Sequence, residues 1–302
     1  MLWHTENAVA GIVAGFVTTT ALHPLDVVRT RFQVQDGHDA VVPKYRNTAN
    51  ALLSIARIEG LRGLYAGLFP AVLGSSISWG LYFYLYNTTK SWNRRWRGED
   101  LGAGLHLISA TEAGALVCLV TNPVWLAKTR LQLQGPGLGV HKPYAGFADS
   151  LQRIVKEEGW WALYKGLGPS LILVSHASLQ FMAYEEGRKL ALDLRRFYHS
   201  GDKKEDVCLK PSDFAILGGL SKVFATLVTY PYQVIRTRIQ QRPLRDGRVK
   251  YTGIWHTSAE ILKHEGATGF YKGIVPSLLK NVPASSITFL VYEMVLKLLQ
   301  KQ

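Results

Sequence analysis

The residues of this sequence with the clearest chemical potential are cations that lie within long stretches of apolar and small residues. Lys222 and Lys280 each interrupt such a stretch, and Arg29, Lys128 and Arg236 each follow a proline near the end of one. A positive charge at membrane depth is costly without an anionic partner. This placement predicts a cavity that attracts a negatively charged small molecule.

The stretches that carry these cations are long enough to cross a membrane. Asn7–Leu25, Ala66–Thr89 and Gly166–Tyr184 contain no Asp, Glu, Lys or Arg, and three further stretches are interrupted by single charges. At 1.5 Å per residue, helices of this length cross roughly 30 Å of hydrocarbon. Their Ser, Thr, His and Gln residues predict helices that face lipid on one side and a wet cavity on the other.

Composition narrows the class of protein further. The chain has 302 residues, a formal net charge of +13 and two cysteines, which excludes a disulfide scaffold and a multi-cysteine metal cluster. The basic residues collect between the apolar stretches rather than on one face with interleaved aromatics, so we expect no nucleic-acid partner. Because Gly-x4-Gly-Lys-Ser/Thr, His-Glu-x-x-His and Gly-x-Ser-x-Gly are missing from the sequence, we also expect no enzyme, no metal and no cofactor.

An internal repeat organises the chain. The pattern Pro-x4-base-Thr-base-x-Gln occurs at 24–33, 123–132 and 231–240. An acid-Gly pair and then Tyr-x-Gly follow it each time, which divides the chain into repeats at 1–96, 97–198 and 199–302. Each proline removes a helix hydrogen bond and bends its span, so that the helix ends converge and close a cavity.

These repeated motifs resemble the signature of the mitochondrial carrier family along the whole chain. The resemblance implies an all-α membrane protein with six transmembrane helices in a threefold pseudosymmetric bundle, with short matrix-side helices between the odd and even spans. It also implies a monomer that moves a small anionic substrate by alternating access to one central site. Membrane lipids are the other implied partners, and the family's default location is the mitochondrial inner membrane.

The carrier resemblance implies a matrix gate, in which each acid of the motif pairs with the first cation of the next repeat. Only Asp26 is acidic here, so we expect it to pair with Lys128. Gln233 then gives Arg29 only a hydrogen bond, and Trp125 leaves Arg236 without a partner and available to the substrate, with a solvated cation as the alternative. The full gate consists of Asp26, Arg29, Gln33, Lys128, Gln132, Gln233 and Gln240, of which Gln33, Gln132 and Gln240 are the bracing glutamines.

A second, cytoplasmic gate is implied on the even helices by the pattern aromatic-acid-x-x-base. It consists of Tyr86, Lys90, Tyr184, Glu185, Arg188, Tyr292 and Glu293. Asn87 replaces the acid in the first repeat and Leu296 replaces the base in the third. We therefore expect at most two ion pairs and a gate that opens with little resistance.

The substrate site is predicted by aligning the even helices on their gate tyrosines in steps of four residues. This alignment, with the mid-span cations and two tryptophans, gives Gly74, Ser78, Trp79, Trp125, Ile172, His176, Gln180, Lys222, Arg236 and Lys280. For the two tryptophans the alternative to stacking on a planar ring is packing or a lipid interface, and for His176 it is a satisfied core residue. For the two lysines the alternative is a side chain that snorkels to the interface.

Substrate identity rests on a closer resemblance within the family. Trp125 at an acidic position is typical of the branch that carries nucleotide-like and pteridine substrates, and the runs SWGLYFYLYN, VSHASLQFMAYEE and LLKNVPASSITFLVYE resemble folate carriers. We therefore expect folate transport, and the chloroplast envelope as the location, because the similarity is closest to the folate carriers of that membrane. FAD or NAD carriage, or a carrier-like scaffold that no longer transports, remain the alternatives.

The Tyr-x-Gly segments imply a structural lipid, since the family uses them to bind cardiolipin at helix N-termini. The matching residues are Gly67, Lys165, Gly166, Lys272 and Gly273. Ala66 stands where the other two repeats have a lysine, so the first of these lipid sites lacks that cation.

Overall fold

The computed structural model describes residues 2–36, 45–97, 103–135, 142–198, 211–243 and 249–300, and its elements are helices. The first repeat forms α1 (Leu2–Val34), α2 (Thr48–Leu64) and α3 (Leu68–Arg97). The second forms α4 (Ala103–Gln132), α5 (Phe147–Glu158), η1 (Trp160–Tyr164), α6 (Leu167–Leu173) and α7 (His176–Tyr198). The third forms α8 (Pro211–Ile239), α9 (Ile254–Glu265), η2 (Ala267–Tyr271) and α10 (Ile274–Leu299). The predicted all-α fold is confirmed.

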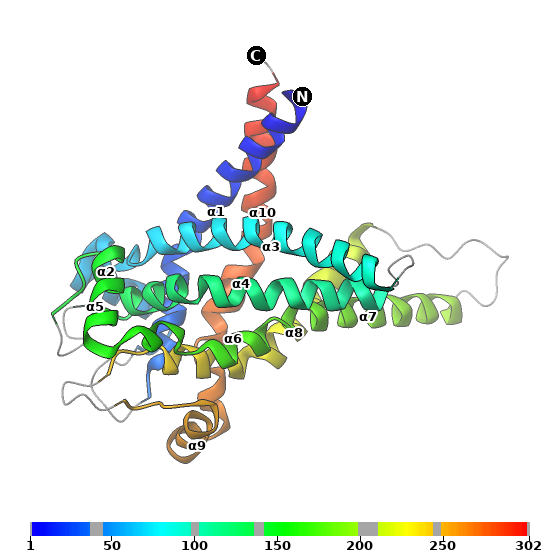
Figure 1. The fold of residues 1–302 in the computed structure, drawn as a ribbon. Coiled ribbons are helices and arrows are strands. Elements are labelled where there is room, and N and C mark those ends of the chain that lie inside the picture. Colours follow the sequence, from blue (N-terminus) through cyan, green and yellow to red (C-terminus); the bar gives the residue numbers. More distant parts are fainter. Residues whose placement is uncertain are drawn as a thin grey trace.

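The long helices associate in pairs that join one repeat to the next. The last long helix of each repeat packs against the first helix of the following one, which gives the pairs α3–α4, α7–α8 and α10–α1. Figure 1 shows α1 and α10 side by side, diverging from α3, α4 and α7, with both termini at the far end of the α1–α10 pair. The three helix pairs connect the repeats in a ring, which is completed by the contact between α1 of the first repeat and α10 of the third.

Each short helix packs on the first helix of its own repeat. Val27 and Val28 of α1 form a buried cluster with Ala51 and Ile55 of α2. Corresponding clusters join α4 to α5 and α8 to α9, with Ile154 and Ile261 in the place of Ile55. A full apolar side chain buried at each of these contacts contributes about 1.5–3 kcal/mol. Three equivalent cores thus hold the proline-containing helices at one end of the molecule.

The predicted set of six spans is altered in the second repeat. Five segments of the described chain are helical, long and apolar enough to cross a membrane, and the sixth is divided between α6 and α7. At the break the backbone N–H groups of Val174 and Ser175 bond three residues back, and the Ser175 hydroxyl donates to the Ile172 carbonyl at 2.7 Å. A serine that takes a helix carbonyl in this way favours a local tightening of the turn.

The motif prolines do not end their helices. Pro24, Pro123 and Pro231 lie inside α1, α4 and α8, which continue through the cations that follow them. The three helices therefore carry the charged motifs to the same end of the bundle, where their side chains meet.

Candidate functional site

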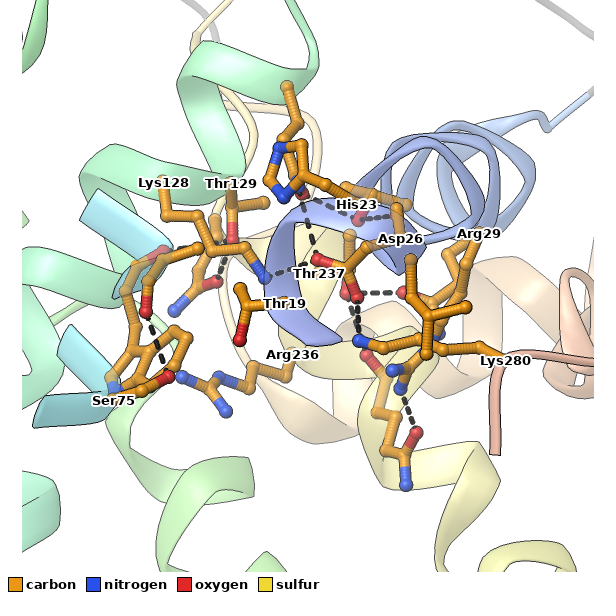
Figure 2. A pocket seen from close by; sticks show the side chains of 18 of the residues that line it. Thr19, His23, Asp26, Arg29, Ser75, Lys128, Thr129, Arg236, Thr237 and Lys280 are labelled. Atoms are coloured by element: carbon orange, nitrogen blue, oxygen red, sulfur yellow. Dashed lines mark hydrogen bonds and ion pairs between the residues drawn. The ribbon is translucent and has the colours of Figure 1, made fainter. Parts of the chain in front are cut away.

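A cavity of about 470 Å³ opens between the long helices. Among the described residues that line it, the cations are Arg29, Lys128, Arg236 and Lys280, and the carboxylate is Asp26. Figure 2 shows these side chains, contributed by α1, α4, α8 and α10, around one space. Four positive groups against one negative group make this cavity a site for an anion.

Asp26 is buried and uses both of its oxygens. Its Oδ2 accepts from Lys128 Nζ at 2.5 Å and from Gln132 Nε2 at 3.1 Å, while its Oδ1 accepts from Lys280 Nζ at 2.6 Å. The expected Asp26–Lys128 pair is therefore present. Lys280, expected from the sequence to face substrate, lines the cavity and is also bound to the same carboxylate, because α10 packs directly against α1. One acid thus joins helices of all three repeats.

Two arginines lack such a carboxylate. Arg29 donates through Nη2 to Gln233 Oε1, as expected, and its guanidinium lies 5.9 Å from the centre of the Tyr230 ring. The Nε atoms of Arg29 and Arg236 are both buried without a hydrogen-bond partner in the described part of the chain. Because a buried unpaired donor is costly, Arg236 is the cation in this cavity with the most to gain from an anionic ligand.

The three glutamine braces bond to threonines. Each side-chain oxygen accepts a hydrogen bond of 2.8–2.9 Å from the threonine between the two cations of the preceding repeat. The pairs are Thr30–Gln132, Thr129–Gln240 and Thr237–Gln33. These threonines were not among the residues predicted from the sequence, although their threefold repetition at the centre of base-Thr-base is the signal that marks them.

The second cation of each motif is structural and lies outside the cavity lining. Arg31, Arg130 and Arg238 are buried, and each forms a double hydrogen bond with the glutamate of its own repeat's acid-Gly pair, with Nη2–Oε2 distances of 2.7–2.9 Å. Each Nε also donates to a glutamine backbone carbonyl of another repeat at 3.0–3.1 Å. These contacts were also missed, since ion pairs between a long helix and a surface helix have no local sequence pattern.

Glu158 and Glu265 of these pairs are held in their charged form. Burial by itself raises the pKa of Glu158, but hydrogen bonds and charge from Arg130 and Lys165 outweigh it and lower the pKa below its ordinary value. For Glu265, burial is outweighed in the same way by Arg238 and Lys272, and its pKa is lowered too. The ion pairs at this end of the molecule therefore persist well below neutral pH.

Trp125 lines the cavity from the position that is acidic in the family motif. Lys128 Nζ lies 5.3 Å from the centre of its ring. A Cβ atom added at Gly74 would lie 3.5 Å from the same ring and 3.1 Å from Val124 Cγ1. Gly74 therefore makes room for Trp125 rather than for substrate directly.

The even helices show a different register from the predicted one. His176 and Lys280 line the cavity as expected, but Ser75 and Leu173 do so in place of their neighbours Gly74 and Ile172. A step of four residues overshoots one helical turn by about 40°, so three steps from a gate tyrosine accumulate about 120°. This drift explains why Gly74 and Ile172 were misplaced by one position, while the long side chain of Lys280, equally far from its tyrosine, still reaches the cavity.

The remaining predicted substrate residues lie outside this lining: Ser78, Trp79, Gln180 and Lys222. Trp79 is 63% exposed and its ring stacks on Phe83, which gives it the outward position of the lipid-facing alternative. Lys222 is half-buried on α8, about two turns from Thr229. A role for these four residues in substrate binding stays a prediction.

Two contacts of the cytoplasmic gate residues lie within one helix or one helix pair. Tyr86 bonds His106 of the adjacent α4 at 2.9 Å, and Arg188 lies 3.9 Å from Glu185 on its own helix. Lys90, Tyr184, Tyr292 and Glu293 lie on α3, α7 and α10, and Figure 1 shows α10 running away from α3 and α7. The contacts that join all three repeats are thus those at Asp26.

The residues expected to bind lipid have structural roles. Gly67, Gly166 and Gly273 have φ of 76°, 79° and 83°, and a Cβ atom there would lie 2.9–3.1 Å from atoms of the next repeat. Lys165 and Lys272 pair with Glu158 and Glu265 at 2.7 and 2.5 Å. Glycine is required because only it allows this backbone conformation at such close approach.

Comparison with known proteins defines the class to which this fold and cavity belong. A sequence model of the family described as mitochondrial carrier protein matches residues 2–95, 99–194 and 209–302. The chain therefore belongs to the mitochondrial carrier family and is a multi-pass membrane carrier. It is 57% identical to Folate transporter 1, chloroplastic, of Arabidopsis thaliana over 99% of this chain and 97% of that protein.

Less similar relatives are named as transporters of other substrates. Nicotinamide adenine dinucleotide transporter 1, chloroplastic, of Arabidopsis thaliana is 37% identical over 96% of this chain and 90% of that protein. The mitochondrial pyrimidine nucleotide transporter RIM2 of Saccharomyces cerevisiae is 30% identical over 96% of this chain and 85% of that protein.

Proposed function

We propose that this protein transports folates across an organelle inner membrane by alternating access to the cavity around Asp26. The observation that carries the proposal is the excess of cations: four positive side chains line the cavity against one carboxylate. A reduced folate brings two carboxylates and a pteridine whose pyrimidine ring is planar. The carboxylates match Arg236 and Lys280, and the ring matches the face of Trp125.

The relatives favour folate over the alternatives. The 57% identity to a protein named as a folate transporter exceeds the 37% to one named as a nicotinamide adenine dinucleotide transporter. FAD and NAD are also anionic and ring-bearing, so charge alone does not separate them from folate. They are therefore the competing outcomes of the test.

The test is uptake of labelled 5-formyltetrahydrofolate into liposomes that contain the purified protein. We expect saturable uptake, and a rise in KM of at least about tenfold for Arg236→Ala and Lys280→Ala, because each removes a partly buried cation from a substrate carboxylate. Lys189→Ala is the matched control, since Lys189 is exposed and pairs only with Glu186 of its own helix. Uptake of FAD or NAD in place of folate would keep the carrier mechanism and overturn the substrate, and no uptake of any of them would favour a non-transporting scaffold.

Location, lipid and oligomeric state belong to the same proposal. We place the protein in the chloroplast envelope, because both of the Arabidopsis relatives described above are named as chloroplastic, with the mitochondrial inner membrane as the alternative. We further propose that it works as a monomer and that an anionic lipid such as cardiolipin binds near Gly67, Gly166 and Gly273. Fluorescence microscopy of a tagged chain and lipid-dependent thermal stability test these points.

A further inference from the structure

A histidine on the α7 side of the cavity has a fixed orientation. His176 begins α7 and is half-buried in the cavity lining. Its Nδ1 lies 2.9 Å from the hydroxyl oxygen of Thr229 on α8. This bond joins the two helices and engages one of the two ring nitrogens.

The hydrogen of the Thr229 hydroxyl is already committed. Thr229 Oγ1 donates to the Ala225 carbonyl at 2.8 Å, one helical turn earlier. A hydroxyl has one hydrogen to donate, so toward His176 the same oxygen acts only as an acceptor. Nδ1 of His176 must therefore carry the hydrogen, and in the neutral ring Nε2 then carries a lone pair.

Several carboxylate and amide oxygens of the cavity lining already accept hydrogen bonds, whereas hydroxyl oxygens such as that of Thr19 can still accept one. Asp26 is bound by two lysines and Gln132, and Gln233 Oε1 is bound by Arg29. The oxygens of the three bracing glutamines accept from the motif threonines. The cationic side chains of the lining can donate hydrogen bonds but cannot accept them. A ligand that itself carries N–H donors thus meets few open acceptors among the described residues.

We propose that His176 Nε2 is the hydrogen-bond acceptor that recognises an N–H or NH2 group at the uncharged, ring end of the substrate. This assignment rests on the proposed folate transport and deepens it. The 2-amino-4-oxo pyrimidine edge of a pterin presents such donors. The substrate then lies with its carboxylates toward Arg236 and Lys280 and its amino edge toward α7.

Substrate analogues test the assignment through selectivity. The probe pair is folic acid and 2-desaminofolic acid, each used as a competitor of labelled 5-formyltetrahydrofolate uptake in proteoliposomes. For the wild type we expect the amino compound to inhibit about tenfold more strongly, because the analogue leaves the Nε2 lone pair unsatisfied. In His176→Phe the ratio should fall to about one through weaker inhibition by folic acid, because the acceptor is gone for both compounds.

A second substitution keeps the test valid if the phenylalanine variant does not fold. Thr229→Val removes the oxygen that fixes the tautomer, so Nε2 is free to take the hydrogen, and the inhibition ratio should fall by several fold. Thr226→Val is its matched control. Thr226 is buried on the same helix and donates to the Lys222 carbonyl at 2.7 Å, but it does not line the cavity or touch His176.

The outcomes separate this assignment from the proposed function. A wild-type ratio near ten that falls in His176→Phe and Thr229→Val, but not in Thr226→Val, supports it. Folate uptake with a ratio that neither variant changes would overturn the role of His176 and leave folate transport standing. A wild-type carrier that takes up no folate would overturn both.

Discussion

Asp26 Oδ1 and Lys280 Nζ lie 2.6 Å apart, while Asp26 Oδ2 holds Lys128 at 2.5 Å. The lysine best placed to bind an anionic substrate is therefore also a partner of the acid that closes the gate. A substrate carboxylate that binds Lys280 competes with Asp26 for the same ammonium group. Substrate binding and loosening of the gate are thus linked through one side chain.

This relationship predicts that Asp26→Asn destabilises the closed gate. The substitution leaves two partly buried ammonium groups without their carboxylate, and we expect a loss of about 2–4 kcal/mol in stability. Thermal unfolding of the purified protein in detergent measures it. Asp213→Asn, which breaks a pair with Arg195 outside the gate, should have a smaller effect. Equal effects of the two substitutions would contradict the special position of Asp26.

An acidic residue at position 125 should strengthen the matrix gate and weaken substrate binding. Trp125→Asp restores the acid that the family pattern pairs with Arg236, so the gate should gain stability and Arg236 should lose its availability. We expect a rise in KM for folate of about tenfold or more, with a higher unfolding temperature. Trp125→Phe keeps an aromatic face without the charge and should change KM much less. A Trp125→Asp variant with unchanged KM would show that Arg236 does not bind the substrate.

Much of this site could be predicted from the sequence, because the three repeats can be aligned and the positions at which one repeat differs from the others can be identified. Asp26 is the one motif acid, so its pairing with Lys128 and the lack of a carboxylate for Arg236 both followed. The sequence did not show that Lys280 reaches Asp26, since that contact depends on how α10 packs on α1. It also did not show the break before His176, where a serine hydroxyl competes for a helix carbonyl.

The pairs around Glu158 and Glu265 predict a specific loss of stability in acid. The pKa of each carboxyl is lowered by its arginine and lysine neighbours once the opposing effect of burial is included. Their contribution is complete above the unfolded pKa of about 4.3 and is lost as the pH falls through the lower folded value. Unfolding temperatures between pH 7 and pH 3 measure this loss.

Substitution of one of these carboxyls provides the control. Glu158→Gln should lower the unfolding temperature at pH 7 and reduce its dependence on pH below about 4.3, since one carboxyl no longer titrates. A variant that keeps the full acid sensitivity of the wild type would contradict the assignment of that sensitivity to Glu158.

Two further ion pairs join different repeats outside the matrix gate. Lys250 lies 2.6 Å from Asp36, and Arg242 lies 2.5 Å from Glu157 and stacks 4.6 Å from the centre of the Tyr144 ring. Both pairs are partly exposed, so a double-mutant cycle on Asp36 and Lys250 should give a coupling of only about 0.2–1 kcal/mol that weakens in high salt. A coupling well above this range would show that the pair acts as part of the gate.

Substitution of Gly273 should distinguish a role of this glycine in helix packing from a role in lipid binding. A Cβ atom there would lie 2.9 Å from the Arg29 carbonyl oxygen, and its φ of 83° is unfavourable for alanine. We expect Gly273→Ala to cost at least about 1–3 kcal/mol through strain and displacement of α1, even in lipid-free detergent. Gly218→Ala in α8 is the matched control, because no atom lies within 4 Å of its added Cβ and alanine favours a helix. A Gly273→Ala protein as stable as the wild type without lipid, but no longer stabilised by cardiolipin, would show that this glycine serves the lipid rather than the contact between α1 and α10.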